Sequence, residues 1–516
     1  MSQHEISRRT VLQGALGGAL LIGAGGLLTA CAPPASSGSG AGGSGGVLRV
    51  GLVGGGQFDD ISDPKLAQTD IGFARMQALY DALGRNSTEF KLENQLAESF
   101  EPNADASVWT VRIKKGVEFH NGKTLTAADV IFSVQRAVDP SDPAIMAGSL
   151  LPYVDPAQIT KVDDNTIRFT LTGPASFFPD RMSNWGMSIV PADFNPNAPV
   201  GTGAFKFVSM VPGDRSVYER FNNYWGEKAI VDRLEIIDFA DATAAVNALI
   251  SGQLDAIGSV PSGQFKAVEG AGASLLVAKN AQLPGFVMRT DTAPFNDNRV
   301  REAFRLLVDR DQMVKQALNG YGAIGNDMLI PSGNDYPADL PQRVYDPEKA
   351  KSLLAAAGQS GMTVRLPSAP NNLSWVQLAP EQFKAGGVTV QVDAVDGNAF
   401  FANEYLKAPF SNGQSPRQNG LIGISSTLFN PRLNGTHWND ERTTQLFNKA
   451  MQTIDITARD AIVRDMQTIQ YHEGGYINWG FSDLVSGIGS HVTGFKQNSA
   501  AMIPLNNFIF NQISVN

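Results

Sequence analysis

Apolar positions along the chain repeat with two periods, and these periods predict a mixture of strands and helices. Val47–Val53 is a short apolar run with a glycine-rich exit, which is typical of a buried strand. Ile71–Leu83 has helical spacing, and Trp109–Ile113 alternates with polar residues as a half-buried strand does. A capping box at Thr126–Asp129 is expected to open a further helix. The pattern therefore predicts a folded body that begins near residue 47.

Beyond residue 200 the pattern becomes a regular alternation of strands and helices. Met362–Leu366 and Val388–Val395 are predicted as strands, and Ser374–Ala385 between them is predicted as one helix. A strand–helix–strand unit implies parallel pairing, so this part of the chain is expected to form an α/β lobe. Further helices are predicted to begin at Asp241, Asn298, Asp309 and Asp346, and a strand at Leu254–Ile257.

The N-terminus has a different pattern. Arg8 and Arg9 precede Val11–Leu28, which carries no charge, and "LTAC" ends at Cys31, the only cysteine. This arrangement predicts a secretory signal over residues 1–30. The arginine pair resembles the twin-arginine export signal, with the general secretory route as the alternative, and "LTAC" resembles the lipobox of bacterial lipoproteins, which implies lipidation of Cys31. Residues 31–46 would then be a lipidated flexible tether. The alternative is a permanent membrane anchor, but the many glycines in this apolar run would make it a poor membrane-spanning helix.

Composition and charge exclude several classes of function. Removal of residues 1–30 leaves 39 basic and 49 acidic residues, a net charge of −10 without a basic block. We therefore expect no nucleic-acid partner. The five histidines, at 4, 120, 437, 472 and 491, have no metal-ligand spacing, and no G-x-S-x-G motif occurs. No metal, cofactor or catalytic residue is predicted, and His120, at a turn, is expected to be structural.

Four ordered phrases carry a resemblance to a known family. Leu96–Pro140 is the most specific, and it is followed by "VGTGAFKF" with "ERFNNYWG" at Val200–Gly226, by "PFNDNRVREAF" with "DRDQMV", and by "YDPEKAKSLLAAAG". The chain from Val47 onward resembles the extracytoplasmic solute-binding proteins of peptide- and nickel-type ABC importers (family 5, which includes oligopeptide- and dipeptide-binding proteins).

The resemblance implies an α/β fold, a two-lobed periplasmic-binding-protein clamshell with an additional inserted domain. Lobe I would comprise residues 47–82, 199–283 and 491–516, the insert residues 83–198, and lobe II residues 284–490, with hinge crossings near Pro284 and Ser490. It also implies a monomeric, extracytoplasmic receptor that is not an enzyme, and the lipid anchor predicted independently from the N-terminus fits such a receptor. Such a receptor captures a small polar solute (a peptide, oligosaccharide or chelate) and delivers it to an ABC permease in the membrane. A secreted lipoprotein hydrolase and a sensory receptor are the alternatives.

The same resemblance places candidate ligand contacts on three segments. Ala67–Asp70 of lobe I corresponds to a stretch whose backbone pairs with peptide ligands, although its residue types also suit a helix N-cap. Trp185 lies where the insert would line the pocket, but a lone tryptophan is more often part of a core. The third group lies on lobe II. The predicted contacts are therefore Gln68, Thr69 and Asp70 on lobe I, Trp185 in the insert, and Trp375, Phe400, Ser425, Ser426, Phe429 and Asn430 on lobe II.

One departure from the family concerns the ligand. Peptide-binding members hold the α-ammonium of the peptide with a lobe II aspartate, but Asn419–Asp440 has no acidic residue before Asp440. Ser425, Ser426, Thr427 and Asn430 offer neutral hydrogen bonds there, while Asp393, Asp396 or Glu404 is the alternative source of a carboxylate. The departure predicts a solute without a free α-ammonium, with Trp185, Trp375 and Phe429 available to stack on flat faces.

Overall fold

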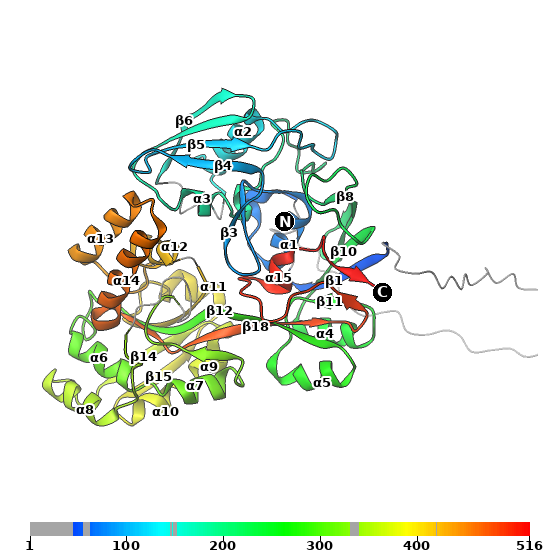
Figure 1. Ribbon diagram of the computed structural model, residues 1–516. Coiled ribbons are helices and arrows are strands. Elements are labelled where there is room, and N and C mark those ends of the chain that lie inside the picture. Colours follow the sequence, from blue (N-terminus) through cyan, green and yellow to red (C-terminus); the bar gives the residue numbers. More distant parts are fainter. Residues whose placement is uncertain (1–44, 55–61, 145–146, 148–151, 331–339, 419) are drawn as a thin grey trace, which may run out of the picture. The chain divides into compact units, whose positions relative to one another are not determined.

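A computed structural model describes residues 45–54, 62–144, 147, 152–330, 340–418 and 420–516 (Figure 1). The predicted signal and Cys31 lie outside these ranges. Among the described residues no helix is long and apolar enough to cross a membrane. The described chain is a mixed α/β structure with one large sheet and smaller sheets beside it.

The large sheet has ten strands, and its core strands were predicted in part. Across it lie β16 (Phe410–Pro416), β12 (Ser274–Met288), β18 (Gly480–Ile488), β11 (Ala256–Ile257), β1 (Val47–Val53), β10 (Arg233–Phe239), β9 (Arg215–Arg220) and β8 (Phe205–Val211), while β13 (Gly322–Ile324) pairs with β18 and β17 (Tyr476–Asn478) with β12. The predicted strand at Val47–Val53 is confirmed, and it runs parallel to β10 and β11. The predicted strand at 254–257 is shorter in the structure.

Two long antiparallel strands connect the two ends of this sheet. β12 and β18 pair along most of their length and run side by side in Figure 1. Their register shifts between Ala278 and Gln282, and Asn280 at this irregularity has a left-handed φ of 53°. The carboxylate of Asp483 binds two consecutive residues within the irregularity, through the Asn280 N–H at 2.9 Å and the Lys279 Nζ at 2.8 Å. The sheet is therefore interrupted where the chain crosses between the predicted lobes.

Helix α1 (Asp70–Leu79) is shorter than the predicted helix at 71–83. A close contact with Gly201 and Gly203 explains its end. The Gly203 N–H donates to the Leu79 carbonyl at 2.9 Å, and a Cβ at Gly201 would lie 2.0 Å from the same oxygen. Glycine is required at position 201 because no side chain fits there. The segment around Gly201–Gly203, which leads into β8, occupies the space into which another turn of the helix would extend.

A separate four-stranded sheet lies within residues 83–198. Its order is β4 (Ala97–Pro102), β5 (Val108–Ile113), β7 (Thr166–Leu171) and β6 (Val154–Asp163). Helix α2 (Ala127–Ala137) covers this sheet, and its predicted capping box between Thr126 and Asp129 is confirmed. The short elements β2 (Gly84–Asn86), β3 (Leu92–Asn94), α3 (Phe178–Arg181) and η3 (Trp185–Met187) complete the region.

The predicted strand–helix–strand unit is present with a broken helix. β14 (Thr363–Ser368) and β15 (Thr389–Ala394) pair in parallel, as predicted. Between them are α9 (Leu373–Val376) and α10 (Ala379–Lys384), so the prediction of one helix over 374–385 was wrong. Pro380 explains the break, since proline has no N–H to donate and is tolerated only in a first helical turn.

Aspartate caps begin most of the longer helices, because their carboxylates accept the free N–H groups of the first turn. Asp241, Asp309 and Asp346 cap α4 (Ala242–Ile250), α7 (Arg310–Ala317) and α8 (Pro347–Ala356) as predicted. Helix α6 (Asn298–Leu306) begins at Asn298 as predicted, and Asp297 caps it. The remaining helices are α5 (Phe265–Gly270), α11 (Gly397–Ala399), α12 (Gly420–Ile424), α13 (Glu441–Gln452), α14 (Ile456–Glu473) and α15 (Pro504–Phe508), with left-handed residues in α15.

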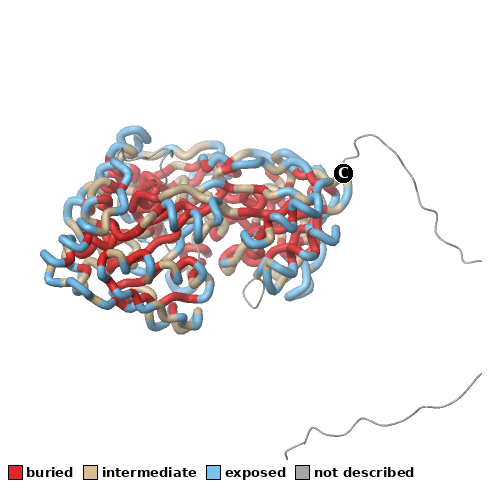
Figure 2. The backbone as a smooth tube through the Cα atoms, turned by 90° about the horizontal axis from the view of Figure 1, so that it is seen from below, coloured by how far each residue is buried: buried red, intermediate tan, exposed pale blue. Residues whose placement is uncertain are grey.

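Buried backbone runs through the interior of these layers, and the exposed residues gather at turns and helix faces (Figure 2). The apolar side chains form separate clusters around the large sheet, the insert sheet and the β14–β15 unit. One cluster includes residues of both the predicted insert and the predicted lobe II, among them Phe177 and Ile422.

Candidate functional site

A cavity of about 210 Å³ lies beside the edge of the large sheet. Its walls come from β12, from the edge strand β16, from β17 and from two π-helical turns, η6 (Phe400–Glu404) and η7 (Ser425–Phe429). The lining residues run from Leu283 to Asn478, and all of them except Leu283, the last residue of this part of predicted lobe I, belong to predicted lobe II. Such wide turns interrupt ordinary helices and occur often at functional sites.

None of the 24 described residues that line the cavity carries a charge. The polar lining consists of amides and hydroxyls, and the apolar lining includes the rings of Phe400 and Phe401. A concave, largely apolar site with a few oriented polar groups is the usual form of a small-molecule site. The arrangement can therefore hold a neutral polar molecule.

Side-chain hydrogen bonds fix the orientation of the amides at the sheet edge. Asn372 Nδ2 donates to Asn412 Oδ1 at 3.0 Å, and Asn412 Nδ2 donates to the Pro367 carbonyl at 2.7 Å. On β17, Asn478 Nδ2 donates to the Met328 carbonyl at 2.7 Å. These bonds use one N–H of each of the Asn412 and Asn478 amides within the protein, and they hold the amide planes in place.

Two acceptors at the cavity have no hydrogen-bond partner in the described part of the chain. They are Asn372 Oδ1 and Gln418 Oε1, and both atoms are buried. An unsatisfied buried acceptor costs about 1–3 kcal/mol. Both residues line the cavity, but the two oxygen atoms themselves are closed off from solvent in this conformation.

Close backbone contact positions the strands of the site. Gly285 of β12 pairs with Asn478 of β17 and with Gly413 of β16, and a Cβ at Gly285 would lie 2.9 Å from the Ile477 carbonyl. Glycine permits this approach because it has no side chain. The polar sequence of β16, FSNGQSP, gave no strand signal, and sequence reasoning missed this wall of the cavity. Its run of uncharged polar residues beside the aromatic residues at 400–405 was the only available signal.

The alternative carboxylates are already engaged. Arg365 binds both Asp393 and Glu404, the latter through two bonds of 2.8 Å. The Asp396 carboxylate caps α11 by accepting from the Asn398 N–H at 3.0 Å. None of these three carboxylates lines the cavity, so their contacts do not support the role of an ammonium ligand.

Of the ten predicted contact residues, Phe400 lines the cavity and is buried. Thr427, named as a neutral hydrogen-bonding group, also lines it and donates to the Gly423 carbonyl at 2.6 Å. Ser425 and Ser426 are buried in the adjoining turn, and Ser426 Oγ accepts from Arg181 at 3.2 Å. Asn430 ends the same turn and accepts the Arg432 N–H at 3.0 Å.

The three predicted stacking rings pack against protein rings. Trp185 stacks on Phe73 of α1 with ring centroids 4.7 Å apart, and Phe429 stacks on Phe447 at 4.0 Å. Trp375 is 5% exposed, within the cluster around β14 and β15. None of the three lines the 210 Å³ cavity, and contact between these rings and a ligand stays a prediction.

The lobe I candidates lie together at the start of α1. Gln68 is exposed, Thr69 holds the N-cap position and Asp70 is the first helical residue. Burial raises the pKa of the Asp70 carboxyl from 3.8 to about 6. They belong to a different segment from the cavity residues, and their role in binding also stays a prediction.

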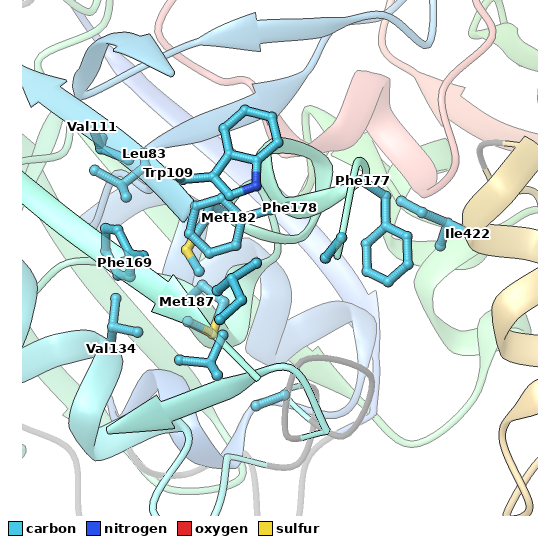
Figure 3. Close-up of a cluster of buried hydrophobic side chains, with 14 of the residues drawn as sticks. Leu83, Trp109, Val111, Val134, Phe169, Phe177, Phe178, Met182, Met187 and Ile422 are labelled. Atoms are coloured by element: carbon cyan, nitrogen blue, oxygen red, sulfur yellow. The ribbon is translucent and has the colours of Figure 1, made fainter. Parts of the chain in front are cut away.

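The predicted insert contacts lobe II beside the η7 turn (Figure 3). Ser176 donates its N–H to the Met451 carbonyl at 2.9 Å and its Oγ to the Ala450 carbonyl at 2.8 Å. The ring of Phe177 lies against Ile422 in the shared apolar cluster. Ile422 precedes the η7 turn, so the insert supports one wall of the cavity. Sequence reasoning did not predict this contact.

No group of histidine, cysteine and carboxylate side chains that could hold a metal ion occurs among the described residues. His120 lies between two backbone groups of the Gly201–Gly203 segment, with Nδ1 accepting from the Gly201 N–H at 3.2 Å and Nε2 3.0 Å from the Gly203 carbonyl. These contacts give His120 a structural role, as expected from its place at a turn.

Comparison with known proteins identifies the fold and the family. The pattern described as "Bacterial extracellular solute-binding proteins, family 5 Middle" matches residues 91–431. The glutathione-binding protein GsiB of Pectobacterium atrosepticum is 28% identical over 462 residues, covering 84% of this chain and 88% of that protein. Heme-binding protein A of Haemophilus influenzae is 32% identical over 317 residues, covering 55% of this chain and 57% of that protein.

Solved structures agree with the expected fold class. DppA of Helicobacter pylori, in complex with the peptide STSA, superposes with a TM-score of 0.76 at 21% identity, covering 91% of this chain and 98% of that one. AgaA of A. tumefaciens R10, in complex with agropinic acid, gives 0.76 at 25% identity over 91% and 99% of the two chains. The two-lobed α/β binding-protein fold is thereby confirmed. The chain belongs to the bacterial extracellular solute-binding proteins of family 5, which serve ABC importers.

Proposed function

We propose that this protein captures a neutral polar solute in the 210 Å³ cavity, whose lining residues run from Leu283 to Asn478 in the sequence, and delivers it to an ABC permease. The observation that carries the proposal is that the described residues lining the cavity are all uncharged. A free α-ammonium taken out of water needs an opposite charge nearby, because burying an unpaired charge is costly. The carboxylates named from the sequence as alternatives, Asp393, Asp396 and Glu404, are bound to Arg365 or to a helix N-terminus. A solute without a charged amine meets no such cost.

The names of the relatives indicate the range of chemistry that this fold accepts. They include glutathione-binding and heme-binding proteins and complexes with a peptide and with agropinic acid. Within that range the neutral lining favours a blocked peptide, an oligosaccharide or another uncharged polar compound. Binding without chemical change is the expected activity, with no catalytic residue required.

Isothermal calorimetry with matched peptides tests the proposal. We expect free di- to pentapeptides to bind weakly, and N-terminal acetylation to leave their affinity unchanged or to raise it. Submicromolar binding of a free peptide that acetylation abolishes would instead show an ammonium site. Continuing heat release after saturation would reveal turnover and favour the hydrolase alternative.

We also propose a lipid-anchored location and a hinge, which rest on different features. The "LTAC" sequence supports acylation of Cys31 after export, with residues 31–46 as a tether. The register shift at Ala278–Gln282, just before Pro284, supports a hinge in the paired strands β12 and β18. The proposed lobes keep the bounds predicted from the sequence. A ligand held by both lobes would shift the population toward the closed form.

A further inference from the structure

Phe401 is an apolar ring left in solvent at the edge of the cavity. It is 64% exposed and lines the cavity together with Leu433, which is 44% exposed. Of the large apolar side chains that are exposed in the described part of the chain, these two belong to the cavity. An apolar group that stays exposed beside a binding cavity gains free energy when a ligand covers it.

The ring of Phe401 is held by its neighbours. It meets the buried Phe400 edge-on, with centroids 5.5 Å apart at 85°, and it meets Tyr405 at 5.5 Å and 61°. We call Phe400, Phe401 and Tyr405 the aromatic edge. The backbone beneath is closed by a 2.8 Å bond from the Tyr405 N–H to the Phe400 carbonyl, and the bonds between Arg365 and Glu404 tie the turn to β14. The aromatic edge is thus pre-arranged for contact.

Polar groups of the same cavity complement this apolar face. The lining carries uncharged hydroxyl and amide side chains, among them those of Ser411, Gln414 and Tyr405. The phenol of Tyr405 is neutral at physiological pH and its hydroxyl can donate as well as accept; burial raises its pKa still further above the ordinary value. A ligand that satisfies these groups needs both hydroxyl or amide donors and a flat face.

We propose that the aromatic edge selects solutes in which a flat ring face adjoins neutral hydrogen-bond donors. The proposal rests on the neutral-solute function and narrows its ligand class. The negative face of an aromatic ring attracts the slightly positive C–H groups of a partner ring, and aromatic pairs also stack offset or edge-to-face. A pyranose ring of an oligosaccharide and the side-chain ring of a blocked peptide share this chemistry.

The test compares ring-bearing and ring-free neutral probes by calorimetry. The probes are the N-acetylglucosamine trimer, acetyl-Ala-Tyr-Ala-amide and acetyl-Ala-Ala-Ala-amide. We expect Phe401→Ala to lower the affinity for whichever ring-bearing probe the native protein binds, by about tenfold or more. The affinity for the trialanine probe should not change. Phe401→Tyr should restore the affinity because it restores the ring. Ile456→Ala is the matched control, since Ile456 is 60% exposed and lies outside the cavity.

The two ring-bearing probes distinguish a sugar from a peptide source. Equal binding of a ring-bearing probe to the native protein and to Phe401→Ala would overturn the inference, as would binding of trialanine but of neither ring-bearing probe. If only free, unacetylated peptides bind, the neutral-solute function fails, and Ala-Tyr-Ala against Ala-Ala-Ala with the same variants then decides the aromatic edge separately. Absence of binding by all of these probes would overturn both.

Discussion

His120 should make the folded protein sensitive to mild acid. Its Nδ1 accepts the Gly201 N–H, so Nε2 must carry the ring proton that faces the Gly203 carbonyl. Protonation would place a second N–H against the N–H of Gly201. The pKa of His120 is lowered from 6.5 to about 4, mainly by burial and in smaller part by the nearby Lys206, while the bond to Gly203 opposes the shift.

The size of the effect follows from the two pKa values. Between pH 6.5 and 4 the folded state binds fewer protons at this site than the unfolded state, so the free energy of unfolding falls as the pH is lowered through this window. The full shift corresponds to roughly 3 kcal/mol, of which about 2 kcal/mol is lost at pH 5. Solvent reaches the partly exposed ring, so we expect a loss of about 1–2 kcal/mol at pH 5.

Urea unfolding of the native protein and of His120→Gln at about pH 7.5 and about pH 5 measures this loss. The raised pKa values of Asp70 and Asp81, each about 6, act in the opposite direction in both proteins and cancel in the comparison. We expect the stability difference between native protein and variant to shrink by about 1–2 kcal/mol at the lower pH.

Phe221→Leu is the matched control, because Phe221 packs edge-on against the His120 ring at 5.0 Å and does not titrate. The stability difference between this variant and the native protein should be the same at both pH values. A difference between native protein and His120→Gln that does not change with pH would refute the assignment of a buried neutral histidine.

Three further predictions test the insert contact, the hinge and the anchor. Phe177→Ala should cost about 3–5 kcal/mol of stability and speed hydrogen exchange in α13 and α14. Phe169→Ala, in the same cluster but within the insert sheet, should leave exchange in these two helices slow. Equal exchange rates in the two variants would contradict a supporting role for the insert. A saturating binder should make the protein more compact in solution scattering while each lobe keeps its internal structure, and an unchanged radius despite tight binding would argue against the hinge. Cys31→Ser should abolish acylation. An unmodified thiol at Cys31, found by mass spectrometry of the native protein, would disprove the lipid anchor.

Local features of the sequence determined much of the fold. Aspartates before apolar helical runs marked helix starts at positions 241, 309 and 346, because capping depends only on nearby backbone N–H groups. The parallel pairing of β14 with β15 also followed from local pattern, since a helical crossover dictates it. The family phrases and the absence of an acidic residue before Asp440 were likewise readable in the chain.

Only the tertiary structure decided what these residues contact. The end of α1 depends on the approach of Gly201, more than a hundred residues away, and the polar strand β16 exists because β12 pairs with it. Whether a ring is core or binding surface is equally a matter of packing. Trp375 is enclosed by other residues, whereas Phe401, which follows it in the chain after α10 and β15, faces solvent at a cavity. Both residues are aromatic. Their roles differ because their burial differs, and burial is set by tertiary contacts that the local sequence does not encode.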